Sequence, residues 1–332
     1  MAMMTYAEAA RQALREAMQR DPRVVAMGED LGRGGVFGQY KGLQQEFGAH
    51  RVIDTPISEA TIVGAAVGMA LVGHRPVVEM RIADFALCAA DELVNQAAKA
   101  RYMFGGQGRV PLVVRQPIGI WHGFAAQHSQ SLEAWYVHVP GFVVVAPSTP
   151  ADNYALLSAA IRCDDPVIYM EHKELWATSG DVPDGHEAAL GKARIARAGN
   201  DLTIVTWSKA VHLALEAAAA AARDGLSVEV IDLRTLWPWD RETVFASVAR
   251  TGRLLVVHEA VQAAGFGAEI AATVAECLDG ELVAPVRRLG APRIPVPYAP
   301  PLEDAARITA EQILAAARQA VAATRRRRSA AE

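Results

Sequence analysis

The stretch VIDTPISEATIVGAAVGMALVGHRPVVE, residues 52–79, decides the fold class because it contains one complete strand–helix–strand unit. Residues 50–54 predict a short strand, and Val77-Val78 begins the next one. Between them, residues 59–72 combine small and apolar residues over a helical length, and Gly73 supplies the residue that commonly ends a helix. Two strands joined by a helix are typical of a parallel sheet with right-handed crossovers.

The same alternation continues along the chain and predicts two doubly wound α/β domains. Strand-like and helical runs fill the first half, and a second series begins at residue 202. Between the two series, residues 171–200 are rich in glycine and polar residues, as expected for a crossover between domains. We therefore predict one α/β domain over residues 1–185, a second over 190–325, and a basic tail at 326–332.

The composition excludes several classes of protein. Lys and Arg total 33 against 37 Asp and Glu, so the formal charge of -4 provides no general basic field for nucleic acid. The longest apolar runs are far shorter than the roughly 20 residues that span a bilayer, so we expect no membrane segment. Three distant cysteines without zinc-ligand spacing favour a reducing compartment, and we expect a cytoplasmic protein. Arg325 to Arg328 are expected to be a solvated tail.

Three side chains could carry chemistry, although each also has a simpler structural explanation. Glu59 opens the predicted helix, where an acid interacts favourably with the helix dipole by about 0.3–1 kcal/mol. Held among apolar neighbours, the same carboxylate would gain proton affinity and could share a proton with a bound heterocycle. His128 follows a strand and a glycine-containing loop, and is either a ligand-site residue at the sheet edge or a loop hydrogen-bonder. Phe85 is either a core residue or a shelf for a flat ring.

A glycine-rich stretch, GEDLGRGGVFG at residues 28–38, follows a predicted strand. Its glycine spacing does not match a dinucleotide fingerprint, and no apolar helix follows directly. A phosphate-binding turn that does not open a helix lacks the helix dipole. We therefore predict a loop here, in a position to cover an active site.

Five further motifs occur in order along nearly the whole chain. They are DTPISE (54–59), QHSQS (127–131), EVIDLRTL (229–236), HEA with GFGAEI (258–260 and 265–270) and PVPYAPPLE (295–303). Together they resemble the β subunits of the thiamine-diphosphate-dependent first component of 2-oxo acid dehydrogenase complexes. That family acts on pyruvate, acetoin or branched-chain 2-oxo acids.

The resemblance implies a pyrimidine-binding α/β domain followed by a transketolase-C-like α/β domain, with thiamine diphosphate as the cofactor. It implies that Glu59 hydrogen-bonds N1′ of the aminopyrimidine and favours the imino tautomer, whose nitrogen removes the proton of thiazolium C2. Phe85 would stack on the pyrimidine ring, and Ile57 would contact it. His128 would support acyl transfer to a lipoyl group, by donating a proton to the dithiolane.

The resemblance also predicts partners. Relatives that hold the cofactor alone carry a Gly-Asp-Gly segment followed by an Asn, which bind Mg²⁺ and diphosphate, and this sequence has no such segment. We therefore expect a separate α subunit to hold both, in an α2β2 heterotetramer with its active sites at α/β interfaces. A lipoyl-bearing acyltransferase component is the expected acyl acceptor. Glu171-His172-Lys173 is more similar to pyruvate and acetoin members than to branched-chain ones.

A potassium site is a further expectation from the family, because related subunits often bind K⁺ through backbone carbonyls and an Asp-x-Asn pair. The corresponding residues here are Leu112, Ala160, Ile161 and Asp165, and Cys163 stands where the Asp is usual. A hard cation prefers oxygen to a neutral thiol. The cysteine therefore weakens the expectation of K⁺ in this chain.

Two alternatives remain open at this point. Arg81, Trp121 and His122 lie in loops beside the expected site and differ from the better-known members, which favours a specialised thiamine-dependent acyl- or aldehyde-transfer subunit of secondary metabolism. A non-catalytic scaffold that keeps only the fold and the partner surfaces is the other alternative. The presence of Glu59 and His128 disfavours it.

Overall fold

The computed structural model describes residues 2–36 and 38–323, which form two compact units. Unit 1 contains the residues up to Lys192 together with Arg234–Pro238 and Val296–Glu303. Unit 2 contains Ala193–Leu233, Trp239–Pro295 and the described residues from Asp304 onward. Two later segments of the chain thus belong to unit 1. The predicted tail, with Arg325 to Arg328, lies outside the described residues.

Unit 1 is built on a seven-stranded sheet. Its strands are β2 (Val24–Gly28), β3 (Val52–Asp54), β4 (Arg75–Glu79), β5 (Val113–Ile118), β6 (Val143–Val145), β7 (Val167–His172) and β12 (Thr235–Trp237). Their order is β12-β6-β7-β5-β4-β2-β3, and every neighbouring pair is parallel except β12 with β6. A separate antiparallel pair joins β1 (Ala2–Thr5) and β8 (Ser179–Val182).

Helices connect these strands. They are α1 (Tyr6–Arg20), α2 (Leu43–Phe47), α3 (Glu59–Leu71), α4 (Ala98–Met103), α5 (Glu133–Val137) and α6 (Pro150–Arg162). α1 begins at a capping box in which Thr5 and Glu8 satisfy each other's backbone amides. α6 begins at Thr149, whose side chain accepts from the Asp152 amide, with Pro150 in its first turn.

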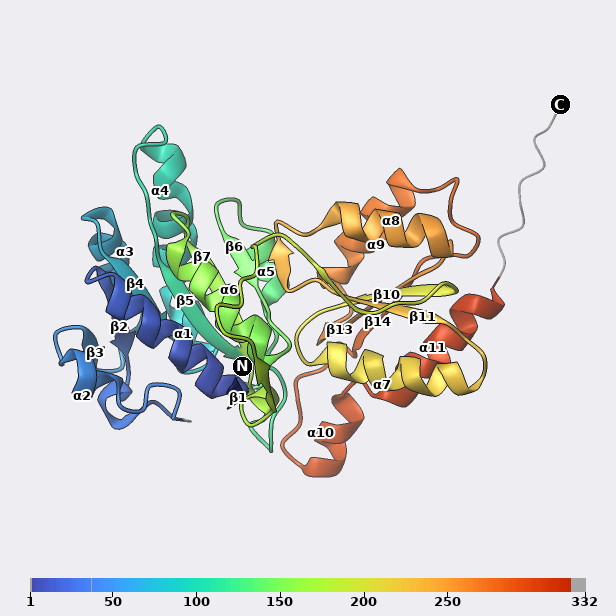
Figure 1. The fold of residues 1–332 in the computed structure, drawn as a ribbon, viewed down its shortest axis with the longest axis horizontal. Coiled ribbons are helices and arrows are strands. Elements are labelled where there is room, and N and C mark those ends of the chain that lie inside the picture. The colour runs from blue at the N-terminus through green and yellow to red at the C-terminus, as the bar shows by residue number, and fades with distance from the viewer. Residues whose placement is uncertain (1, 37, 324–332) are drawn as a thin grey trace. The chain divides into compact units, whose positions relative to one another are not determined.

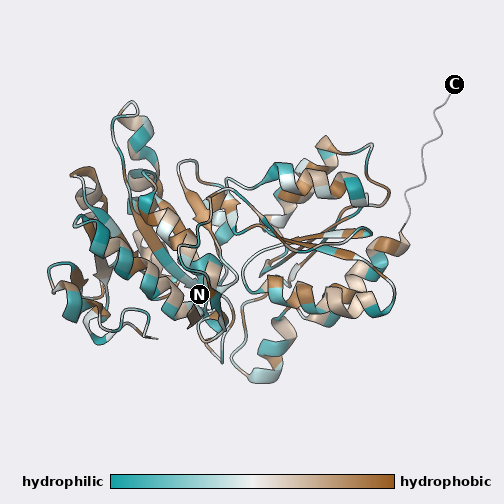
Figure 2. Ribbon diagram, viewed as in Figure 1, coloured by the Kyte–Doolittle hydropathy of each residue, from teal (hydrophilic) through white to brown (hydrophobic). Residues whose placement is uncertain are grey.

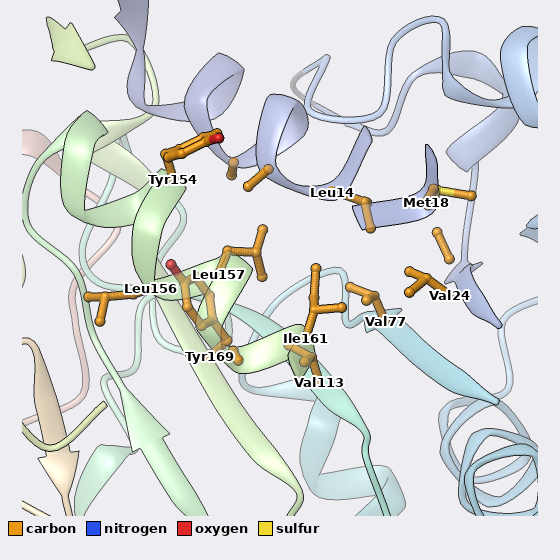
Figure 3. Close-up of a cluster of buried hydrophobic side chains, with 14 of the residues drawn as sticks. Leu14, Met18, Val24, Val77, Val113, Tyr154, Leu156, Leu157, Ile161 and Tyr169 are labelled. Carbon is orange, nitrogen blue, oxygen red and sulfur yellow. The ribbon is translucent and has the colours of Figure 1, made fainter. Parts of the chain in front are cut away.

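The core of unit 1 lies between the sheet and the pair α1 and α6. Leu14 and Ile161 come from these two helices and point toward the sheet, where Val77 and Val113 are fully or almost fully buried (Figure 3). Burying such an aliphatic side chain contributes roughly 1.5–3 kcal/mol. This packing fixes the sheet whose carboxyl edge carries the candidate site.

Unit 2 is a five-stranded sheet between two helical layers. Its strands are β9 (Arg194–Arg197), β10 (Leu202–Thr206), β11 (Val228–Asp232), β13 (Leu254–Val261) and β14 (Arg287–Ala291), in the order β14-β13-β10-β11-β9. All neighbouring pairs are parallel except β11 with β9. Figure 1 shows α7 (Ala210–Arg223) and α11 (Ala310–Ala322) on one face, with α8 (Arg241–Thr251) and α9 (Gly267–Cys277) on the other. Figure 2 shows that hydrophobic residues follow the central strands.

The predicted α/β fold class is confirmed, and the differences lie at the sheet edges and in segments with weak patterns. The antiparallel strands β8, β9 and β12 are short segments without an apolar run, and the sequence predicted none of them. Residues 292–301 are rich in proline, and α10 (Pro300–Ala306) begins inside this segment. A proline is tolerated in the first turn of a helix. Within residues 2–36 and 38–323, no helix combines the length and apolar character that crossing a membrane would need.

His258 on β13 is a fully buried imidazole in the core of unit 2. Its ring stacks on Trp207 with the centroids 5.2 Å apart. Three glycines leave room for it, because a Cβ on any of them would lie 2.6–2.9 Å from the ring; they are Gly265, Gly267 and Gly290. Burial lowers the pKa of His258 to about 4, so the folded chain keeps this ring neutral.

This burial makes the stability of unit 2 depend on pH. In the unfolded chain, His258 takes up a proton near its ordinary pKa of about 6.5. In the folded chain, the buried ring does not take up this proton until the pH is near 4. The folded state is therefore progressively destabilised relative to the unfolded state as the pH falls from about 6.5 toward 4. Between about pH 7.5 and about pH 5, this one group should lower the free energy of unfolding by roughly 2 kcal/mol.

Chemical unfolding of the chain and of His258→Gln at both pH values measures this contribution. The variant should be less stable at the higher pH, yet lose less stability on acidification. Equal losses in the two proteins would show that His258 is not the group responsible.

Candidate functional site

Five neighbouring strands of unit 1 each lead into one residue of the candidate site. In the sheet, β3, β2, β4, β5 and β7 are consecutive and parallel, so their carboxyl ends lie at one edge. That edge is where open α/β sheets bind ligands. The residues that follow the five strands are Glu59, Glu29, Phe85, His128 and Lys173.

Glu59 is the first residue of α3 and is partly buried. Two residues earlier, Ile57 exposes 78% of its surface. An apolar side chain exposed beside a carboxylate forms a surface suited to one face of a flat ring with a protonatable nitrogen. The structure therefore places these two predicted site residues together.

Glu29 is a second carboxylate at this site, which the sequence did not reveal. Burial raises its pKa, and the negative charges of Glu59 and Asp30 act in the same direction, against the opposing charge of Arg81. Arg81 Nη1 lies 2.7 Å from Asp30 Oδ2 and 4.0 Å from Glu29 Oε2. The signal that could have found Glu29 is its position directly after β2, the neighbour of β3 in the sheet.

Phe85 and His128 meet at the same edge. Their rings are 5.1 Å apart at 82°, in an edge-to-face contact. Phe85 begins a short 3-10 helix, Phe85–Ala89, which packs beside α3. Both side chains are only partly buried, so Phe85 is available to a ligand. The structure thus brings the aromatic ring and the imidazole to the helix that Glu59 opens.

Hydrogen bonds from neighbouring strands hold the His128 segment. Lys173, almost fully buried, donates from Nζ to the His128 carbonyl oxygen at 2.8 Å. Gln130 donates to Asp84 Oδ1 at 2.6 Å, which ties the His128 segment to the residue before Phe85. Burial raises the pKa of Asp84. These bonds hold the His128 backbone and the nearby Gln130 side chain in place.

Trp121 and His122, which motivated the alternative of a specialised subunit, lie in the loop before His128. Trp121 contacts Phe124 with ring centroids 5.0 Å apart, and Phe124 in turn contacts His128 at 5.9 Å. Trp121 also contacts Trp176, with ring centroids 5.9 Å apart. An aromatic row therefore leads to the imidazole, while His122 is exposed.

The described residues of the glycine-rich stretch, 28–36 and 38, are anchored to the sheet by hydrogen bonds. They include a short 3-10 helix, Leu31–Arg33, and the Gly32 amide donates to Asp54 Oδ1 at 2.8 Å. Just after the stretch, Tyr40 is fully buried and donates to Glu79 Oε2 at 2.7 Å. The stretch is thereby tied to the carboxyl ends of β3 and β4.

A buried polar network supports that anchor. Arg115 donates to the Tyr40 hydroxyl at 2.8 Å and to Glu171 Oε2 at 2.8 Å from Nε. Burial, together with the charge of Glu171, raises the pKa of Glu79 to about 7 against the opposing charge of Arg115. One guanidinium thus serves two carboxyl groups, which lie on β4 and β7.

The residues expected to bind K⁺ already have hydrogen-bond or ion-pair partners within the protein. The Leu112 oxygen accepts from the Val167 amide at 2.8 Å, and the Ala160 oxygen accepts from the Cys163 amide at 3.1 Å. The Ile161 oxygen accepts from Arg75 at 3.0 Å, and Asp165 pairs with Arg101 at 2.8 Å. Within the described residues, no group of three His, Cys, Asp or Glu side chains could hold a metal ion. The groups expected to bind K⁺ are therefore already engaged by other groups of the protein.

Comparison with known proteins accounts for both units. Residues 2–178 match the family model of the transketolase pyrimidine-binding domain, and residues 191–313 match that of the transketolase C-terminal domain. A solved split-gene transketolase, an inactive beta4 tetramer, superposes with a TM-score of 0.81 and covers 97% of this chain and 99% of its own. At 23% identity, that similarity supports the fold alone.

Curated relatives are similar over almost the full length. The beta subunit of acetoin:2,6-dichlorophenolindophenol oxidoreductase from Cupriavidus necator is 46% identical, over 93% of this chain and 94% of that protein. The beta subunit of 2-oxoisovalerate dehydrogenase from Bacillus subtilis is 42% identical, over 96% and 99%. The mitochondrial pyruvate dehydrogenase E1 component subunit beta-2 of Oryza sativa is 45% identical, over 96% and 86%. The chain therefore belongs to the transketolase-like family that includes the beta subunits of pyruvate, acetoin and branched-chain 2-oxo acid dehydrogenases.

Proposed function

We propose that the chain is the beta subunit of a thiamine-diphosphate-dependent first component, which decarboxylates a 2-oxo acid and passes the acyl group to a lipoyl group. One observation carries this proposal: Glu59, Glu29 and the Phe85–His128 pair follow adjacent parallel strands at a single sheet edge. Relatives with 42–46% identity carry the names of such beta subunits, which supports it.

The residues at this edge fit the aminopyrimidine half of the cofactor. Glu59 would share a proton with the ring nitrogen, while the exposed side chain of Ile57 and the partly exposed ring of Phe85 would contact the ring. Bound thiamine diphosphate supplies the electron sink for decarboxylation. His128 would donate a proton at the lipoyl sulfur, since histidine is the side chain that most often acts as a general acid.

The remaining half of the site would come from other chains. We propose an α subunit that holds the diphosphate and Mg²⁺, in an α2β2 heterotetramer, and a lipoyl-bearing acyltransferase as the acyl acceptor. The absence of a Gly-Asp-Gly segment from the sequence supports the division of the site. The names of the relatives, each a beta subunit, support a second kind of subunit.

Pyruvate is the substrate that we favour within this class, with acetoin second. Relatives acting in either reaction have nearly the same identity to this chain, at 45% and 46%. Coexpression with the α subunit, followed by dye reduction with pyruvate, acetoin and 2-oxoisovalerate, tests the proposal. The chain alone should be inactive and the complex active on one of them. A complex that fails to bind thiamine diphosphate by calorimetry would instead support a scaffold.

Glu59→Gln should abolish substrate-dependent dye reduction by the assembled complex. The amide keeps the size of the side chain but cannot share a proton in the same way, and such groups contribute roughly 100-fold or more to the rate. Glu276→Gln, on the exposed surface of α9, is the matched control and should keep full activity. A Glu59→Gln complex with an unchanged rate would refute the assigned role.

His128→Ala should separate two steps of the reaction. Decarboxylation, followed with a dye acceptor, should fall less than acylation of a lipoyl domain, because the imidazole is assigned to proton donation in the transfer. Losses of the same size in both assays would argue against that assignment.

A further inference from the structure

Three arginines contact residues 161–166, which are the end of α6 and the loop that joins it to β7. We propose that these arginines hold the loop in place of a monovalent cation, so that this chain does not depend on K⁺ for its stability. We call Arg75, Arg101 and Arg109 the arginine clamp. They come from β4, from α4 and from the segment before β5, all of them distant in the sequence from the loop that they contact.

Arg75 makes the central contacts of the clamp. Its Nη1 donates to the carbonyl oxygens of Ile161 and Cys163, both at 3.0 Å, and its Nη2 donates to Asp164 Oδ1 at 2.6 Å. The side chain is only 17% exposed. One planar guanidinium thus binds two carbonyls and one carboxylate, the kinds of oxygen that a structural cation would bind.

The other two arginines complete the clamp by binding the aspartates of the loop. Arg109 Nη1 donates to Asp164 Oδ2 at 2.6 Å, so Asp164 lies between two guanidinium groups. Each of its two carboxylate oxygens thus accepts a hydrogen bond from a different arginine. Arg101 Nε lies 2.8 Å from Asp165 Oδ1, the side chain that was expected to bind K⁺.

The charged groups at this loop disfavour the binding of an added cation. A carbonyl oxygen has two lone pairs, so its bond to Arg75 would not by itself exclude an ion. The three guanidinium groups, however, already exceed the two carboxylates of Asp164 and Asp165. The residue in the place of the usual Asp is Cys163, whose sulfur is a poorer ligand for a hard cation than a carboxylate oxygen. An added cation would therefore meet net repulsion.

If the arginine clamp replaces a cation, the thermal stability of the chain should not depend on which monovalent cation is present. Thermal unfolding is measured by scanning fluorimetry in KCl, NaCl and choline chloride at the same ionic strength, so that general screening is equal. The three midpoints should agree within about 1 °C. A midpoint that is several degrees higher in KCl than in both other salts would overturn the proposal.

Substitution of the central arginine tests the clamp directly. Arg75→Met keeps the aliphatic stem but removes the guanidinium, and should lower the midpoint by about 5 °C, because the carbonyl oxygens of Ile161 and Cys163 lose this donor and Asp164 keeps only Arg109. Arg318→Met is the matched control, since it breaks an exposed Arg–Asp pair and should change the midpoint by about 1 °C or less.

Equal effects of Arg75→Met and Arg318→Met would show that the clamp does not hold the loop. If Arg75→Met does not fold, Arg101→Met and Arg109→Met are compared with the control in the same way. Each of these should then lie below Arg318→Met in its midpoint, and a failure of both to do so would contradict the proposal.

Discussion

The candidate site depends on the parallel alignment of five strands in unit 1. Because β3, β2, β4, β5 and β7 run in the same direction and are neighbours, residues that follow them are brought to one edge from positions 29 to 173 of the sequence. The register is explicit: Gly28 at the end of β2 lies opposite Glu79 at the end of β4 and Asp54 at the end of β3. The chemistry of the site follows from which side chains come next.

The same edge explains why buried charges lie beneath the site. A loop that turns over the ends of parallel strands must be tied down, and here Tyr40 is hydrogen-bonded to Glu79 and Arg115. Two carboxyl groups, Glu79 and Glu171, share the Arg115 guanidinium within the sheet. At the opposite end of the same strands, Arg75 performs a comparable task for the α6–β7 loop. Guanidinium groups thus organise both ends of this sheet.

Most of the fold could be predicted from the sequence, because buried parallel strands and their helices have strong local patterns. The stretch from residue 52 to 79 forms a strand, a helix and a strand, as its pattern indicated. β9 and β12 could not be predicted, since each is short and gains its stability by pairing with β11 or β6. Phe85 and His128 were candidates from their positions after strands, the family resemblance implied their roles, and their contact comes from the fold. Glu29 was missed because the sequence shows that it follows a strand but not that this strand lies beside the one that leads to Glu59.

The proposed function depends on Glu59 binding the pyrimidine of thiamine diphosphate in a site completed by another subunit. The most direct measurement is an experimental structure of the assembled heteromer with thiamine diphosphate and Mg²⁺ bound. In that structure, a Glu59 carboxylate oxygen should lie at hydrogen-bonding distance, about 2.7–3 Å, from the pyrimidine ring nitrogen. A pyrimidine bound elsewhere, with Glu59 facing solvent, would contradict the proposed function.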